Sequence, residues 1–250
     1  MGLLNGKVAV ITGTAGGQGR LASLAFAREG AKVVGCDLRR LDNEETVREV
    51  RAAGGEMWGL APVDLTDPNQ VKAFVREAAD RHGGIDIVYN NAGGPRFAPV
   101  ADMSVEDWRR TISVELDTAF YVTKYAWPYL VARHGGVIIN VASMAALIGA
   151  PRPPMAAHVA AKAGLAGLTR QLAVEGGPLG IRAVTISPGP IVTREGDLDD
   201  VTREMISQRT LLKRWGRPEE VVEVALFLAS DRASYITGAN IPIEGGATAW

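Results

Sequence analysis

An apolar run near the start of the chain breaks into a glycine-rich turn and passes at once into a helical pattern. Residues 8–19 read V-A-V-I-T-G-T-A-G-G-Q-G. Glycines let the backbone turn sharply and approach a ligand closely, and the first amides of a helix attract negative charge. The segment therefore predicts a strand, a diphosphate-binding turn and a helix, although an ordinary strand-to-helix junction can also be rich in glycine.

A second observation favours the nucleotide interpretation. Residues 33–36 form another apolar run, and Asp37 follows it, 18 residues after Gly19. In dinucleotide-binding folds, an acid at about this distance binds the ribose hydroxyls. The alternative is that Asp37 only caps the helix that comes next.

The composition limits the class of protein. The chain has 250 residues, of which 47% are hydrophobic, so it can bury one large core without a second domain. Its formal net charge is −1 and its basic residues are scattered, which argues against a nucleic-acid partner. The single Cys36 excludes an internal disulfide. Because no targeting segment and no run of membrane-spanning length is found, we expect a cytoplasmic protein with no membrane partner.

Short apolar runs alternate with amphipathic segments along the chain, which is the pattern of βα units around a buried parallel sheet. The pattern predicts an α/β fold over residues 1–250, a single-domain, Rossmann-like, doubly wound parallel sheet with helices on both faces. Residues 149–155 are too rich in proline for regular structure, and residues 194–215 predict either a substrate lid or a solvated helix. The predicted strands cover residues 7–13, 32–38, 57–64, 85–91, 136–143, 181–187 and 240–244.

Six motifs stand in one order along the chain. They are Thr12-Gly13-x-x-x-Gly17-x-Gly19, Asp64-Leu65, Asn90-Asn91-Ala92-Gly93, Ser143 after an apolar strand, Ser187-Pro188-Gly189-Pro190-Ile191-Val192-Thr193, and Gly238 with Gly245-Gly246. In this arrangement the sequence resembles the short-chain dehydrogenase/reductase family over nearly its whole length. The resemblance implies a bound nicotinamide dinucleotide, a small-molecule substrate and a homo-oligomer, usually a tetramer.

The resemblance also implies which residues contact the cofactor. We expect NAD rather than NADP, because the carboxylate of Asp37 can accept hydrogen bonds from both ribose hydroxyls and would repel a 2′-phosphate. Arg39 and Arg40 weaken this preference, because a guanidinium can hold a phosphate. The expected cofactor-binding residues are Gly13, Gly17, Gln18, Gly19, Asp37, Leu38, Asp64, Leu65, Asn91, Ala92, Gly93, Lys162, Pro188, Gly189, Ile191 and Thr193.

The chain departs from the family at the expected catalytic residues. The family uses an asparagine, a serine, and a tyrosine and lysine spaced Y-x-x-x-K. Ser143 and Lys162 match this pattern, but the residue four before the lysine is His158, and Glu115 stands where the asparagine is expected. Residues 130–234 contain no tyrosine, so a shifted alignment cannot restore the phenol.

A histidine at this position can still move a proton. The reference pKa of an imidazole is about 6.5 and that of a phenol about 10, so an imidazole is a ready base at neutral pH. We expect His158 to take the proton of a secondary alcohol during oxidation to a ketone, or to return it in the reverse reaction. Ser143 would hold the substrate oxygen and Lys162 the cofactor ribose, while the role of Glu115 stays open.

Two alternatives to this dehydrogenase remain. In one, the chain binds NAD without redox turnover, as a sensor or partner subunit, and His158 has no chemical role. In the other, His158 and Glu115 form an acid–base pair in a dehydratase or isomerase that keeps the cofactor as a scaffold. The sequence predicts no metal site.

Overall fold

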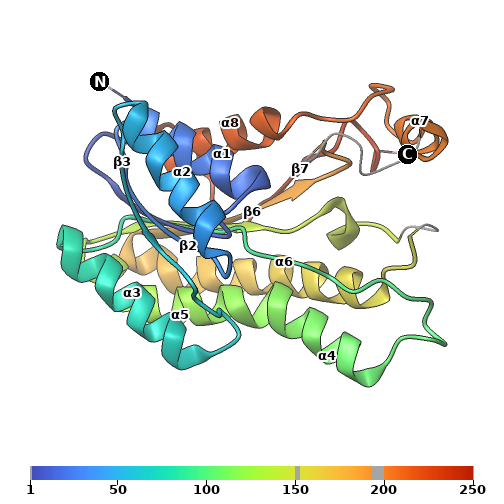
Figure 1. The fold of residues 1–250 in the computed structure, drawn as a ribbon, viewed down its shortest axis with the longest axis horizontal. Helices are drawn as coiled ribbons and strands as arrows, with labels where there is room; N and C mark the ends of the chain where they lie inside the picture. The colour runs from blue at the N-terminus through green and yellow to red at the C-terminus, as the bar shows by residue number, and fades with distance from the viewer. Residues whose placement is uncertain (1, 150–152, 193–199, 250) are drawn as a thin grey trace.

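The computed structural model describes residues 2–149, 153–192 and 200–249 (Figure 1). In these residues, parallel strands form one sheet in the order β3-β2-β1-β4-β5-β6-β7. The predicted doubly wound, Rossmann-like sheet is confirmed. The strands are β1 (Val8–Thr12), β2 (Lys32–Cys36), β3 (Glu56–Leu60), β4 (Ile87–Asn90), β5 (Gly136–Val141), β6 (Ile181–Pro188) and β7 (Asn240–Ile243).

Helices cover both faces of the sheet (Figure 1). On one face lie α1 (Gly17–Arg28), α2 (Arg40–Ala52) and α8 (Pro218–Ala229), and on the other lie α3 (Pro68–His82), α5 (Thr118–Ala132) and α6 (Ala156–Gly176). The remaining helices are α4 (Val105–Ile112), which packs against α6, and α7 (Asp200–Ser207). Shorter turns of helix cover Ser113–Asp117 (π-helical) and Met144–Ala146, Gly177–Leu179 and Asp231–Ala233 (3₁₀).

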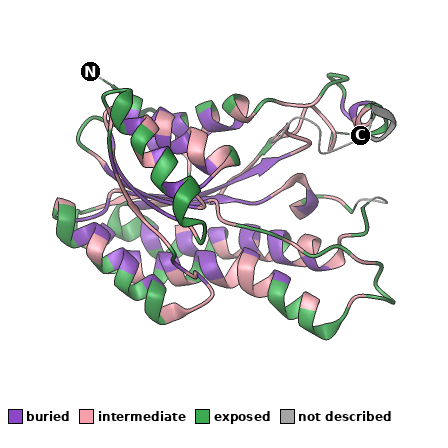
Figure 2. Cartoon of the chain, in the orientation of Figure 1, coloured by how far each residue is buried: buried purple, intermediate pink, exposed green. Residues whose placement is uncertain are grey.

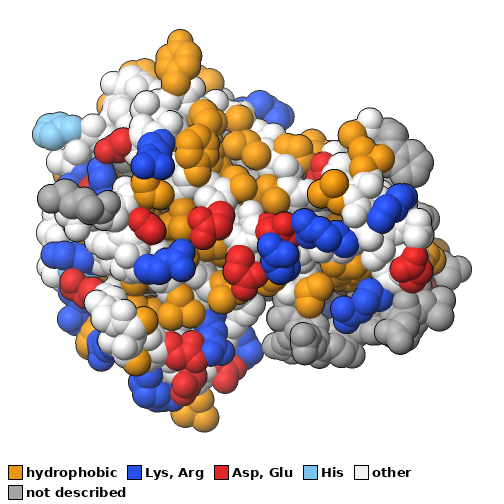
Figure 3. Space-filling model, turned by 90° about the horizontal axis from the view of Figure 1, so that it is seen from above, with side chains coloured by type: hydrophobic (Ala, Val, Ile, Leu, Met, Phe, Trp, Pro, Cys, Tyr) orange, Lys and Arg blue, Asp and Glu red, His pale blue; other side chains and the backbone are white. Residues whose placement is uncertain are grey.

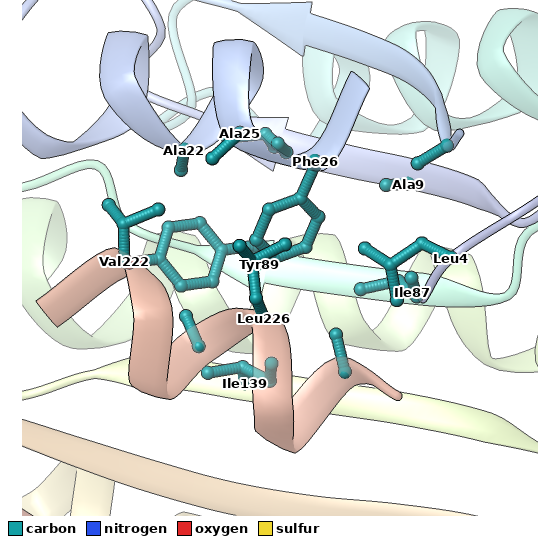
Figure 4. Packing of buried hydrophobic residues seen from close by; sticks show 14 of the residues in the cluster. Leu4, Ala9, Ala22, Ala25, Phe26, Ile87, Tyr89, Ile139, Val222 and Leu226 are labelled. Atoms are coloured by element: carbon teal, nitrogen blue, oxygen red, sulfur yellow. The ribbon is translucent and has the colours of Figure 1, made fainter. Parts of the chain in front are cut away.

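The two faces of the sheet have separate cores, because successive side chains of a strand point to opposite faces. All five residues of β1 are buried. Ile11 belongs to the core under α1 and α8, where Phe26 and Tyr89 lie 5.7 Å apart between ring centroids (Figure 4). Val10 belongs to the core under α3 and α5, together with Phe74. Figure 2 shows the buried positions along the sheet and on the inward sides of the helices.

The predicted strands run one to four residues too far at several ends, for local reasons. β1 stops at Thr12 because Gly13 has a φ of +76°, which leaves the extended conformation. β3 stops at Leu60, two residues before Pro62, which has no N–H to donate to a neighbouring strand.

The strand order places a crevice beside the glycine turn. After β1 the chain passes to β2 on one side, and after β4 it passes to β5 on the other. Ligands of doubly wound sheets bind where the connections diverge in this way, outside the carboxyl ends of the strands. The turn after β1 and the Asn91-Ala92-Gly93 segment after β4 therefore lie at the expected binding edge.

Candidate active site

The glycine turn is closely packed on its inner side and open on its outer side. A Cβ atom at Gly13 would lie 2.9 Å from Nδ2 of Asn91, and one at Gly19 would collide with the carbonyl oxygen of Gly13. Gly17, at a φ of +51°, has nothing within 4 Å of the position that a Cβ would take. The turn thus leaves room in front of α1 for a ligand.

The amino end of α1 suits a negatively charged group. Gly16 is its N-cap and provides no side-chain cap, and the first turn contains no acidic residue. The amides of this turn are therefore available to an anion. Beside them, Oε1 of Gln18 is buried and has no hydrogen-bond partner among the described residues. The open backbone amides fit the oxygens of a dinucleotide's diphosphate, and Oε1 of Gln18, which can only accept a hydrogen bond, fits a hydroxyl of the same ligand.

Asp37 lies across the turn and is bound to it. Its carboxylate accepts hydrogen bonds from the amides of Ala15, at 3.0 Å, and Arg39, at 2.9 Å. The N-cap of α2 is Arg39, so the alternative that Asp37 caps this helix is wrong. The guanidinium of Arg39 contacts Asp42 at 2.9 Å and Asp37 at 3.7 Å. Two carboxylates thus neutralise the cation nearest to the expected ribose.

A cavity of about 580 Å³ opens beside Asp37. The residues of this cavity that the sequence predicted are Gly13, Asp37, Leu38, Asp64, Leu65, Asn91, Ala92 and Gly93. Arg110, Val114 and Thr118 also line it and were missed. Their spacing of four residues places them on one helical face, which is a signal that the sequence contained.

A second cleft, of about 510 Å³, adjoins the first. The predicted residues that line it are Gln18, Asn91, Gly93, Glu115, Ser143, His158, Lys162, Pro188, Gly189 and Ile191. Since Asn91 and Gly93 line both hollows, the two form one trough from Asp37 to His158. Gly17 and Gly19 support the turn and line neither hollow, and Thr193 lies outside the described residues.

Ser143 follows β5 and begins the 3₁₀ turn behind it. Its Oγ accepts a hydrogen bond from the amide of Ala145, at 3.1 Å. Within the described residues the hydroxyl donates to no acceptor, so its hydrogen remains available to a ligand in the cleft. This is the arrangement needed to hold a substrate oxygen.

Glu115 and His158 are in direct contact, although 43 residues separate them. Nδ1 of His158 lies 2.7 Å from Oε2 of Glu115. The glutamate side chain is only 2% exposed and that of the histidine 13%. Glu115 belongs to the π-helical turn between α4 and α5, a distortion that often occurs at functional sites. Nε2 of His158 has no hydrogen-bond partner among the described residues and is accessible from the cleft that the ring lines.

Lys162 completes the cluster one helical turn after His158. Its Nζ donates a hydrogen bond to the carbonyl oxygen of Val141, at 2.9 Å, and lies 3.8 Å from Oε1 of Glu115. Burial lowers the pKa of Lys162, and the charge of Glu115 opposes this effect. The structure therefore brings together the four predicted catalytic residues, Glu115, Ser143, His158 and Lys162, around one cleft.

Comparisons with known proteins show which family the chain belongs to. Residues 13–248 match a family model described as enoyl-(acyl carrier protein) reductase. The chain is 38% identical over 244 residues to a 3-oxoacyl-[acyl-carrier-protein] reductase of Thermotoga maritima, covering 97% of this chain and 98% of the relative. It is also 38% identical over 245 residues to meso-2,3-butanediol dehydrogenase of Serratia marcescens, with 97% and 95% covered. The chain belongs to the short-chain dehydrogenase/reductase family.

A solved relative shows that the likeness extends to the whole fold of this short-chain dehydrogenase/reductase. The crystal structure of a short-chain type dehydrogenase/reductase from Mycobacterium marinum matches with a TM-score of 0.92 and 33% identity. The match covers 98% of this chain and 96% of that one. The single-domain α/β architecture is therefore that of the family.

Positive and negative side chains are mixed on the surface of this family member, as its formal net charge of −1 suggests. Figure 3 shows lysine and arginine side chains interspersed with acidic ones on the face that it presents. Within the described residues no helix is long and apolar enough to cross a bilayer. The part of the chain that the structure describes also has no cluster of three metal-ligating side chains.

Two irregular segments near the cleft are described in part. Residues 150–152 and 193–199 lie outside the described residues, and they include part of the predicted 149–155 segment and the start of the predicted lid. In the remainder of the lid segment, a hydrogen bond from Nε1 of Trp215 to the carbonyl oxygen of Arg203 joins α7 to the loop after it. None of residues 203–215 is among those that line the cleft around His158.

Proposed function

We propose that this short-chain dehydrogenase/reductase oxidises a secondary alcohol to a ketone with NAD, and that His158 takes the alcohol proton. The observation that carries the proposal is the position of His158. Its Nε2 has no partner within the ranges that the structure describes, its Nδ1 is bound to Glu115 at 2.7 Å, and its ring borders a cleft that joins the Asp37 cavity. An imidazole so held is a general base with one nitrogen directed away from its partner.

The preference for NAD is supported by the surroundings of Asp37. The carboxylate is held against the glycine turn by the amide of Ala15, where a ribose would lie. A 2′-phosphate would face this carboxylate, and the nearby Arg39 is already paired with Asp42. Members of the family generally use NAD or NADP, and these contacts favour NAD.

The other residues have separate tasks in the oxidation. A bound nicotinamide dinucleotide supplies the acceptor for the hydride that leaves the alcohol carbon. The hydroxyl of Ser143 donates a hydrogen bond to the substrate oxygen, and Nε2 of His158 receives the proton that this oxygen loses. The ammonium of Lys162, anchored on Val141, holds the ribose and adds positive charge where negative charge develops.

Glu115 supports oxidation rather than dehydration or isomerisation. A second acid–base group in such a reaction would need a carboxylate free to reach the substrate. Here one oxygen of Glu115 contacts His158 and the other faces Lys162. The name of the Serratia marcescens relative, a butanediol dehydrogenase, also supports a secondary alcohol as the substrate class.

The substrate side of the cleft has an apolar wall. Pro95 lines the cleft, and the ring of Phe97 meets His158 edge-on, with centroids 6.0 Å apart and planes at 82°. We therefore place the apolar part of the alcohol beside these two residues. The homotetramer and the cytoplasmic location remain predictions from the family and the composition.

The test is formation of NADH, followed at 340 nm, with NAD and a panel of linear, cyclic and aromatic secondary alcohols. We expect turnover with at least one alcohol, at least tenfold slower with NADP. Ser143→Ala should lose about 100-fold in kcat, whereas Ser104→Ala, at the exposed cap of α4, should keep full activity. NAD binding without any absorbance change across the panel would support the sensor alternative instead.

A further inference from the structure

The replacement of an amide by a carboxylate at residue 115 needs an explanation of its own. Glu115 is buried, and burying a carboxylate is costly unless partners compensate for its lost water. Its two oxygens face two different groups, Nδ1 of His158 at 2.7 Å and Nζ of Lys162 at 3.8 Å. Both partners belong to α6, whereas Glu115 belongs to the turn before α5.

We propose that Glu115 is a positioning residue that keeps the proton of His158 on Nδ1 and thereby leaves Nε2 as the free base. The proposal rests on the function proposed above, and it explains how a histidine can serve there. An ionised carboxylate only accepts hydrogen bonds, so the ring nitrogen that it contacts must carry the hydrogen. With Nδ1 protonated, the lone pair of the neutral ring lies on Nε2.

The same contact fixes the direction of the ring. Glu115 is held in a π-helical turn, and its carboxylate is wedged beside Gly93, where a Cβ would come within 3.4 Å of Oε1. The imidazole is clamped between this carboxylate and the edge-on ring of Phe97. Because two contacts already orient the ring, little further ordering is needed when it receives the proton.

The positive charge of Lys162 also favours a carboxylate at residue 115. In the family pattern, the tyrosine beside the lysine becomes negatively charged when its phenol loses a proton. His158 is neutral as a base, so that negative charge is missing, and Glu115 supplies it beside Lys162. When His158 receives the alcohol proton, its positive charge arises 2.7 Å from a carboxylate already in place. The two replacements are therefore one coupled change.

The direct test reads the tautomer of His158 without turnover. Protein labelled with ¹⁵N at histidine is compared with Glu115→Gln by imidazole ¹⁵N chemical shifts, with His158→Gln to assign the signals. In the wild type we expect the neutral ring to carry its proton on Nδ1 and none on Nε2. In Glu115→Gln, whose amide can donate or accept, both tautomers should be populated. A wild-type proton on Nε2, or unchanged shifts in the variant, would overturn the proposal.

Steady-state kinetics provide the second readout. Glu115→Gln should lower kcat by about 100-fold or more, because the wrong tautomer has no lone pair toward the substrate, and should change the alcohol KM by less than threefold. Glu106→Gln, an exposed carboxamide exchange on the neighbouring helix α4, is the matched control and should match the wild type. An equal kcat in Glu115→Gln would contradict the positioning role.

A pair of exchanges keeps the proposal testable if Glu115→Gln folds poorly. His158→Tyr alone would place a phenol against the Glu115 carboxylate, which disfavours the phenolate. Adding Glu115→Asn removes that charge, so the double variant should be at least tenfold more active than His158→Tyr. Equal activity of the two would refute the coupling. If the wild type oxidises no alcohol, the proposed function fails, while the tautomer measurement still decides the role of Glu115.

Discussion

Two buried polar clusters lie between the sheet and the helices α5 and α6, and they differ in charge. The first is the charged cluster, formed by Glu115, His158 and Lys162. The second is the neutral network, whose centre is Asn90, Asn140 and Thr169 with Thr123 and Thr185 at its ends. His158, Lys162 and Thr169 share one face of α6, so the two clusters follow each other along the same helix.

The neutral network joins three strands to two helices. Asn90 donates to Oδ1 of Asn140 at 2.8 Å, and Asn140 donates to Oγ1 of Thr169 at 2.9 Å. Thr169 in turn accepts from Thr185 at 2.7 Å and donates to the backbone of α6. All of these side chains are buried, and each of them donates a hydrogen bond to an acceptor inside the protein.

The comparison separates a structural role from a chemical one. The neutral network makes its hydrogen bonds within the protein interior, and none of its five residues lines either hollow. The charged cluster bears the desolvation cost of buried ions, and its His158 ring lines the cleft with Nε2 unpaired among the described residues. In the neutral network the unpaired atom is Oδ1 of Asn90, which is buried away from both hollows. Changes in the neutral network should therefore reduce stability at constant turnover, and changes in the charged cluster should reduce turnover with less effect on stability.

The largest effect is expected for His158→Ala. Loss of the proton acceptor should lower kcat for alcohol oxidation by about 1,000-fold. Urea unfolding should show a loss of no more than about 2 kcal/mol in the free energy of unfolding, because Lys162 still faces the buried carboxylate of Glu115 after its histidine partner is removed. Full activity of this variant would show that His158 has no role in the reaction, and it would contradict the chemical role assigned to the charged cluster.

The next effect is expected for Asn140→Leu. The change removes hydrogen bonds to Asn90 and Thr169 and leaves buried polar atoms without their partners. The free energy of unfolding should fall by about 3 kcal/mol in urea titrations. The kcat of the folded protein should stay within twofold of the wild type. A large loss of kcat at unchanged stability would reverse the roles assigned to the two clusters.

A smaller effect is expected at the surface, where Glu220 forms a third polar cluster with two hydrogen bonds from Arg214 and one from the amide of Arg217. The hydrogen bonds from Arg214 chiefly lower the pKa of Glu220 from 4.5 to about 2. Because the folded-state pKa is depressed, the stabilisation is complete above pH 4.5 and declines as the pH falls toward 2. Glu220→Gln should cost about 1 kcal/mol at pH 7.

The matching measurement for Glu220 is urea unfolding of both proteins between pH 7 and pH 3. The difference between them should shrink as the pH falls. A difference that is constant with pH would mean that the carboxylate charge does not contribute to the helix start. Solvent screens this cluster, so its effect should remain well below that of Asn140→Leu.

The sequence predicted the fold and most of the residues around the trough, because both depend on local patterns. Buried parallel strands are continuous apolar runs, and the glycines after β1 mark a turn that other residues would obstruct. The contact between Glu115 and His158 could not be predicted in this way. It joins two helices, and it depends on a π-helical turn that no periodic pattern announces.

Two smaller misses have different causes. Arg110, Val114 and Thr118 entered no prediction, because the side of the helix that meets the cavity depends on how α4 and α5 pack. The pairing of Arg39 with Asp42 is local instead, because the two residues are three apart at the start of α2, so the sequence contained a signal for it.

The central claim is that His158 takes the alcohol proton through Nε2, and the pH dependence of kcat/KM for NAD-linked oxidation tests it most directly. Between pH 5 and pH 9, kcat/KM of the wild type should rise with pH, because only a neutral imidazole can accept the alcohol proton. In His158→Ala the same rise should be absent. A flat wild-type profile, or the same rise in the variant, would contradict the account.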